Sequence, residues 1–249
     1  MARLPRFLLA DLPHHVVQRG HNGQPIAIDD VDRQRWRELL RDAAVTHQVA
    51  LHAWALRDAA FHLVATPTHA EGLSRMMQSL ARRHAAEFNR RHGRRGTLWE
   101  GRFRASLTEP GPDLLDLMLL VETLAAGPLG DQEPPPDPSA SSLGHHLGQW
   151  RDPAITEPAA WWALGNTPFE REAAWRLRAG RGVALERAQR LQAALQRGRP
   201  VGSPVFLQRL SADGSLPPLS RPRGRPRKSA LQPPLAEPPS AAGDAAPRH

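Results

Sequence analysis

Arginines with an aromatic residue among them form the segment best suited to binding a charged polymer. The arginine fork pairs with phosphate oxygens in a bidentate manner and stays charged at neutral pH, and aromatic rings stack on unpaired bases. The segment therefore predicts contacts with a nucleic-acid backbone, although a solvated surface would have the same composition and core packing is the alternative for the tryptophan. The candidates are Arg82, Arg83, Arg90, Arg91, Arg94, Arg95, Trp99, Arg102 and Arg104.

A second basic motif, SRPRGRPRKS, runs from Ser220 to Ser229. Its R-G-R-P core has the form of an AT-hook, in which glycine lets the backbone lie deep in the minor groove and the arginines reach along its floor. The motif predicts binding to A·T-rich duplex DNA without readout of a unique sequence, and a disordered basic tail is the alternative. The residues concerned are Arg221, Arg223, Gly224, Arg225, Arg227 and Lys228.

The whole chain is basic. Its 249 residues include 33 Lys and Arg against 25 Asp and Glu, a formal net charge of +8. Codon bias in a GC-rich genome would also enrich arginine, so charge alone does not decide the partner. The absence of cysteine excludes disulfides and thiolate metal sites. No apolar run has the length of a signal peptide or a membrane span, which predicts a cytoplasmic, nucleoid-associated protein with no membrane partner.

Hydrophobic periodicity predicts the elements that must position these side chains. Apolar runs indicate strands at residues 14–19, 49–56, 60–65 and 98–107, and apolar residues at helical spacing indicate helices at 31–47, 71–91 and 112–126. This order of strands and helices is typical of an antiparallel sheet covered by helices, an α+β arrangement. In the helix at 71–91 the arginines lie off the apolar stripe, so one side is buried and the other is cationic.

Composition divides the chain into four parts. Residues 1–129 form the predicted α+β domain, and a proline-rich stretch indicates a linker or surface loop over residues 130–158. Residues 159–210 are predicted to be helical, with a small core of their own. Residues 211–249, which include the AT-hook-like motif at 221–228, have little to bury and are predicted to be disordered in isolation. The aromatic anchors of the helical core are Trp161, Trp162, Phe169 and Trp175.

Several separated stretches resemble the REP-associated tyrosine transposases, relatives of the HUH single-strand transposases. They are RLPR near the start, HHVVQRGHN at 14–22, GLSRMMQSLARR at 72–83, FNRRHGRRGTLWEGRFRAS at 88–106 and RPVGSPVFLQRL at 199–210. The resemblance implies a ferredoxin-like domain that binds folded single-stranded DNA such as hairpin palindromes. For active members it also implies a Mg²⁺ or Mn²⁺ site built on two histidines that flank one hydrophobic residue, and a helix-borne tyrosine that attacks the phosphorus.

The chain departs from this family at the positions that carry the chemistry. Where the family has a run like LMPNHVHLLATP, this chain has LRDAAFHLVATP, so His62 is present and Ala60 stands in the place of the first histidine. The tyrosine position falls on Leu120 or, in a second register, on Met118. The second register places Glu122 at the position of the metal-binding carboxamide. The sequence contains no tyrosine, so the family's phosphotyrosine chemistry is expected to be absent.

Three functions are compatible with these residues. The preferred one is a DNA-binding protein of the transposase family that has lost tyrosine-dependent strand cleavage and needs no cofactor. The second is a metal-dependent nuclease in which His62, otherwise a relict ligand, and Glu122 hold the metal and water is the nucleophile. The third is an architectural protein that binds the A·T minor groove through its tail. The resemblance allows either a monomer or a homodimer.

Overall fold

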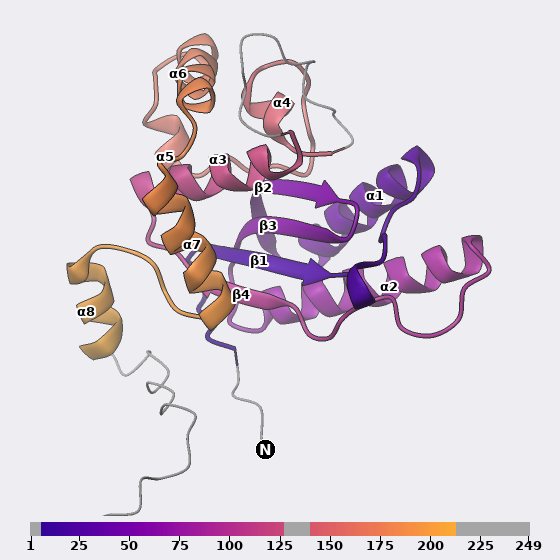
Figure 1. The fold of residues 1–249 in the computed structure, drawn as a ribbon. Helices are drawn as coiled ribbons and strands as arrows, with labels where there is room; N and C mark the ends of the chain where they lie inside the picture. Colours follow the sequence, from indigo (N-terminus) through magenta and orange to yellow (C-terminus); the bar gives the residue numbers. More distant parts are fainter. Residues whose placement is uncertain (1–5, 127–139, 213–249) are drawn as a thin grey trace, which may run out of the picture. The chain divides into compact units, whose positions relative to one another are not determined.

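The computed structural model describes residues 6–126 and 140–212 of the chain (Figure 1). The first part follows the order β1 (His14–Arg19), α1 (Asp30–Thr46), β2 (Val49–Arg57), β3 (Ala60–Pro67), α2 (Gly72–Arg91), β4 (Arg104–Leu107) and α3 (Pro112–Ala126). The four strands form one antiparallel sheet in the order β2-β3-β1-β4. A β-α-β-β-α-β chain with this strand order is the ferredoxin-like arrangement, so the expected α+β fold class is confirmed.

The fourth strand is shorter than the sequence pattern predicts. It begins at Arg104 instead of residue 98, because residues 92–103 form a loop in which Gly96 and Gly101 have φ values of 90° and 149°. Side chains rarely adopt such a backbone, so glycine at these two positions lets the chain leave α2 and turn onto the edge of the sheet.

One face of the sheet is covered by α1 and α2. Both helices are amphipathic, and their buried stripes include Trp36 in α1 and Met76 in α2. Phe61 of β3 meets Trp36 with the ring centroids 5.2 Å apart. The start of α1 is fixed by Asp29, whose carboxylate accepts a hydrogen bond from the Asp32 N–H at 3.0 Å.

The opposite face is covered in part by α3 and α7 (Leu185–Arg197), and Figure 1 shows α7 on the other side of the sheet from α1 and α2. The strands present small side chains there, Ala53, Ala55 and Val64, so the apolar helix α3 packs closely on β2 and β3. The strand β4 lies next to α7.

The remaining helices are α4 (Leu143–His146), α5 (Ala159–Trp162), α6 (Pro168–Arg181) and α8 (Pro204–Ala212). Residues 140–156, within the stretch expected to be a linker or loop, lie along the edge of β2. The Leu56 N–H donates to the Ala140 carbonyl at 2.8 Å, and the Thr156 N–H donates to the Leu51 carbonyl at 2.7 Å. This part of the stretch is therefore hydrogen-bonded to the sheet, and several of its side chains, such as Leu143 and His146, are buried.

The helical region does not bury all four of its expected anchors. Trp161 and Trp175 are buried, but they join a core shared with α3 and the sheet, while Trp162 and Phe169 are exposed. Residues 127–139 and 213–249 lie outside the described residues, and the AT-hook-like motif at 221–228 is among them. Within the described ranges, no helix is both long and apolar enough to cross a membrane.

Candidate nucleic-acid interface

The register of the sheet places Ala60 between two arginines. Ala60 of β3 pairs with Arg57 of β2 on one side and with Arg19 of β1 on the other. Residues directly opposite one another in an antiparallel sheet point to the same face, and residues two apart on one strand share that face. The side chains of Arg57, Ala60, Arg19 and His62 therefore all lie on the face that α3 and α7 cover in part.

A third arginine joins this group through the next row of the sheet. Val17 of β1 pairs with His62 on β3 and with Arg104 on β4. Arg19, Arg57 and Arg104, named here the sheet arginines, are exposed, and none of them forms an ion pair with any residue in the described part of the chain. Two of these unpaired guanidinium groups, those of Arg57 and Arg19, flank Ala60 directly, and Arg104 lies one strand further along the sheet.

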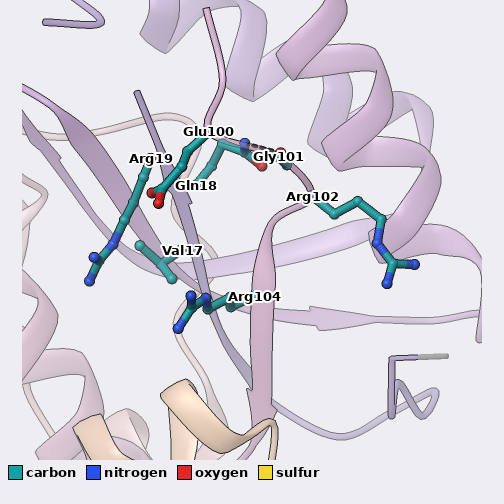
Figure 2. Close-up of a pocket in the computed structure, with 7 residues that line it drawn as sticks. All are labelled: Val17, Gln18, Arg19, Glu100, Gly101, Arg102 and Arg104. Atoms are coloured by element: carbon teal, nitrogen blue, oxygen red, sulfur yellow. Dashed lines mark hydrogen bonds between the residues drawn. The ribbon is translucent and has the colours of Figure 1, made fainter. Parts of the chain in front are cut away.

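The pocket in Figure 2 lies at the β1–β4 side of this group and has a volume of about 110 Å³. Arg19 and Arg104 extend to the same side of it, whereas Arg102 points away from them. Gln18 donates from Nε2 to the Gly101 carbonyl at 2.8 Å, which ties the loop before β4 to β1. Because these arginines stand on paired strands and a fixed loop, their positions are set before any ligand binds.

His62 contributes no positive charge to this surface at neutral pH. Burial, together with the smaller effect of the nearby charges of Arg57 and Arg19, lowers its pKa to about 4. Its Nδ1 lies 3.1 Å from Nε2 of His15, and burial holds the pKa of His15 well below its usual value as well. The two imidazoles form a neutral hydrogen-bonded pair.

Glu122 lies in a different environment from His62. It is fully buried between α3 and the helical region, where Oε1 accepts hydrogen bonds from Ser142 Oγ and His146 Nδ1, each at 2.6 Å. Oε2 accepts from Trp175 Nε1 at 3.1 Å. Both carboxylate oxygens therefore already have protein donors.

The residues around His62 do not fit a divalent cation. Ala60 offers no donor atom, and the guanidinium groups of Arg57 and Arg19 would repel a metal ion bound at His62. Nowhere in residues 6–126 and 140–212 do three or more His, Asp or Glu side chains come together in an arrangement that could hold a metal ion. We therefore derive no step of the function through a metal.

Neither of the two residues of α3 that align with the tyrosine position is a nucleophile. Met118 and Leu120 are both buried in the core formed by α3 and its neighbours. The hydroxyl of Thr123, on the same helix, donates to the Leu119 carbonyl at 2.8 Å, as is common for threonine inside a helix.

The arginines singled out from the sequence fall into two groups. Three of them hold the fold: Arg91 makes ion pairs with Asp29 and Asp32, both at 2.6 Å, Arg83 lies 3.5 Å from Asp42, and Arg94 bonds Gln24. The others are exposed and have no ion pair within the described ranges. They are Arg82, Arg90, Arg95, Arg102 and Arg104.

The aromatic side chains of this segment pack inward. Trp99 donates from Nε1 to the Ala81 carbonyl at 2.9 Å and meets Phe61 edge-on, with the ring centroids 5.7 Å apart. Phe103 is buried, and the Arg6 guanidinium lies 3.7 Å from its ring centroid. Core packing, the alternative considered for Trp99, accounts for most of its contacts.

Arg19 and Arg57 were not among the residues singled out from the sequence. Arg19 lies in the HHVVQRGHN stretch, and its spacing of two from Val17 on a predicted strand was an available signal that they share a face. No local pattern points to Arg57, which reaches the site only through the register of the β2–β3 hairpin.

The strand order and the arginines beside Ala60 and His62 define this part of the chain as a ferredoxin-like α+β domain with a cationic sheet face. No family model and no curated protein matches the chain. Among solved structures, it is similar to a REP-associated tyrosine transposase bound to a REP hairpin, with 12% identity over 64% of this chain and 93% of that one and a TM-score of 0.46. It is also similar to a presumed transposase from Deinococcus radiodurans R1, with 21% identity over 42% of this chain and 84% of that one and a TM-score of 0.33. These are distant relations.

Proposed function

We propose that this chain is a transposase-like DNA-binding protein that binds hairpin or single-stranded DNA through the sheet arginines and does not cleave it by a tyrosine mechanism. The observation that carries the proposal is the position of Arg19, Arg57 and Arg104 around Ala60 and His62. At the place where the resemblance implies a metal bound to a phosphate, the chain presents arginines that bind a phosphate directly.

The chemistry of these groups supports binding without cleavage. A metal ion promotes cleavage by polarising the phosphate and generating or orienting a nucleophile. Guanidinium groups neutralise the phosphate and hold it in a bidentate manner, but they supply no nucleophile. Because the sheet arginines have no carboxylate partner in the described part of the chain, no ion pair must break when DNA binds.

Further backbone contacts are proposed for the exposed arginines of α2 and the following loop. They would extend the cationic surface beyond the sheet face and raise the number of phosphates contacted. Arg83, Arg91, Arg94 and Trp99 support this surface mainly by holding α2 and the loop in place. The exposed residues concerned are Arg82, Arg90, Arg95 and Arg102.

The tail motif at 221–228 is proposed as a second contact. Arg223 and Arg225, one on each side of Gly224, would bind the minor groove of A·T-rich duplex. Two contacts of different type would hold the protein on the nucleoid at duplexes that flank a hairpin. The proposed complex requires no cofactor, because the arginines neutralise the phosphate charge. It can be formed by a monomer or a homodimer.

The binding proposal is tested by measuring hairpin affinity as a function of salt. Changing all three sheet arginines to alanine is expected to lower the affinity by about tenfold or more at 0.15 M salt, and to reduce the slope of log K against log salt by about 0.7 for each lost phosphate contact. Arg41→Ala is the matched control, because Arg41 is exposed on α1, which covers the other face of the sheet. Equal losses in the control would show that the sheet face is not the binding surface.

The cleavage proposal is tested by incubating labelled hairpin DNA with the full chain and Mg²⁺ or Mn²⁺. The expected result is an uncut hairpin and no covalent protein–DNA product. Cleavage that disappears in His62→Ala would instead support the metal-dependent nuclease.

A further inference from the structure

A second cavity lies in the helical region and shares no residue with the pocket beside the sheet arginines. It has a volume of about 520 Å³ and is formed by the loop that follows α4, by α5 and by the start of α6. Cavities of this size are typical of small-molecule sites. Three tryptophans line it: Trp150, Trp161 and Trp162.

Two of these rings are held rigidly from behind. Trp161 is packed against His146 and Trp175, with ring centroids 4.5 and 5.3 Å away. Trp150 lies over Gly144, where an added Cβ would come within 1.8 Å of the indole, so the absence of a side chain at Gly144 makes room for the ring. A flat ligand would therefore meet aromatic walls that are already in place.

The third ring is exposed but supported. Trp162 is 53% exposed, and the Arg171 guanidinium lies 4.4 Å from its ring centroid. Arg171 is itself fixed by donating from Nη1 to the Gly165 carbonyl at 2.9 Å. A cation stacked on an indole limits the movement of the ring.

The polar groups of the cavity are two carboxylates, two guanidinium groups and the imidazole of His145. Glu157 lies 3.4 Å from His145, whereas Glu172, whose carboxylate packs over Gly148, and Arg151 have no ion pair among the described residues. An ionised carboxylate is a hydrogen-bond acceptor with no donor. Since two negative and two positive groups cancel, neither a simple cation nor a simple anion is favoured.

We infer that this cavity binds one unpaired nucleobase that carries an exocyclic amino group, with guanine as the best match and Arg151 as the contact for its phosphate. Aromatic walls suit a planar ring. Guanine presents two adjacent donors, N1–H and the N2 amino group, to one carboxylate. Thymine presents a single N–H that lies between two carbonyl groups. The oxygens of these carbonyls repel a carboxylate. This site is independent of the sheet arginines and goes beyond the proposed function.

The test is a titration of the full chain with dGMP and with dTMP, monitored by tryptophan fluorescence. The expected result is saturable quenching by dGMP at about tenfold lower concentration than by dTMP. Trp162→Leu is expected to weaken dGMP binding by about five- to a hundredfold. Glu172→Gln is expected to remove the preference for dGMP, because dGMP loses its carboxylate acceptor and the repulsion of the thymine carbonyls is relieved.

Matched controls are Phe169→Leu, an exposed aromatic residue of α6 outside the cavity, and Glu186→Gln, an exposed carboxylate of α7. Both are expected to bind dGMP like the unaltered chain. Equal affinity for dGMP and dTMP, non-saturable quenching, or an unchanged preference in Glu172→Gln would overturn the inference. Circular dichroism of each variant verifies that the helices are intact, and a variant that fails this check is replaced by Trp162→Phe or Glu157→Gln.

Hairpins separate this inference from the proposed function. The full chain is expected to bind a hairpin with one unpaired guanine more tightly than a paired hairpin, that is, one with a fully paired stem and no guanine in its loop. Trp162→Leu is expected to abolish that difference and leave the paired hairpin unaffected, whereas loss of the sheet arginines weakens both. If hairpin binding fails altogether while dGMP still binds, the proposed function is wrong and the cavity assignment stands.

Discussion

The imidazoles of His15 and His62 lie on neighbouring strands with Nε2 of His15 3.1 Å from Nδ1 of His62. Burial lowers the pKa of both, so at neutral pH one ring donates a single N–H and the other accepts it. This contact links β1 to β3 through the side chains and gives His62 a structural role that needs no metal ion.

The lowered pKa of His62 predicts a loss of stability in mild acid. An unfolded histidine takes up a proton below about pH 6.5, whereas folded His62 resists protonation down to about pH 4. The contribution of His62 to the free energy of unfolding is therefore fully present above about pH 6.5. It falls as the pH drops toward 4, and the loss is about 2 kcal/mol at pH 5. Urea unfolding at pH 7.5 and 5 is expected to show a smaller drop for His62→Gln than for the unaltered chain. The exposed His21→Gln serves as the control, and an identical drop in His62→Gln would contradict the prediction.

Arg90 and Arg91, adjacent on α2, are predicted to have separate roles. Arg91 bonds Asp29 and the nearly buried Asp32, so Arg91→Ala leaves a buried carboxylate with fewer donors and is expected to cost about 1–3 kcal/mol of stability. Arg90→Ala is expected to leave stability unchanged within about 0.5 kcal/mol and to reduce the salt dependence of hairpin binding. Thermal unfolding and a salt titration of both variants measure the two effects. The reverse pattern would show that Arg91, not Arg90, contacts DNA.

Glu122 is predicted to stabilise the junction between α3 and the helical region. Glu122→Leu removes the acceptor for Ser142, His146 and Trp175 and is expected to cost about 3–5 kcal/mol. Glu122→Gln keeps one carbonyl acceptor and is expected to cost less. Chemical denaturation gives both values. Mn²⁺ titration of Glu122→Gln supplies a check, since loss of Mn²⁺ binding in this variant would assign Glu122 as a metal ligand.

Deletion of residues 213–249 is predicted to separate the two DNA contacts. Because the AT-hook-like motif lies in this segment, the shortened chain is expected to lose affinity for A·T-rich duplex and to keep its affinity for a hairpin through the sheet arginines. Gel-shift titrations with both DNAs measure this. Loss of hairpin binding on deletion would show that the folded region does not bind the hairpin by itself. This result would favour the architectural alternative.

Local pattern predicted most of the elements. The strand at 14–19 and the helix at 112–126 have the predicted bounds, because alternation and continuous apolar runs report burial directly. The strand expected at 98–107 is mostly loop, because glycines at positive φ end the pairing that its apolar residues favour. Composition indicated a linker or loop over 130–158. Edge hydrogen bonds to β2 hold residues 140–156 of it, and such long-range pairing leaves no signature in the segment itself.

The sequence by itself determined the basic character of the chain, the α+β order of its elements, the absence of tyrosine and the position of Ala60 two residues before His62. These depend on residue identity and local spacing alone. The tertiary structure decided which arginines are exposed and free of ion pairs within the described residues. In the folded chain Arg91 forms ion pairs with two aspartates, and Trp99 packs against the core. Arg57 and Arg19 lie on either side of Ala60. Register between strands is set by the packing of whole faces, so residues that are distant in sequence become one surface only when the sheet has formed.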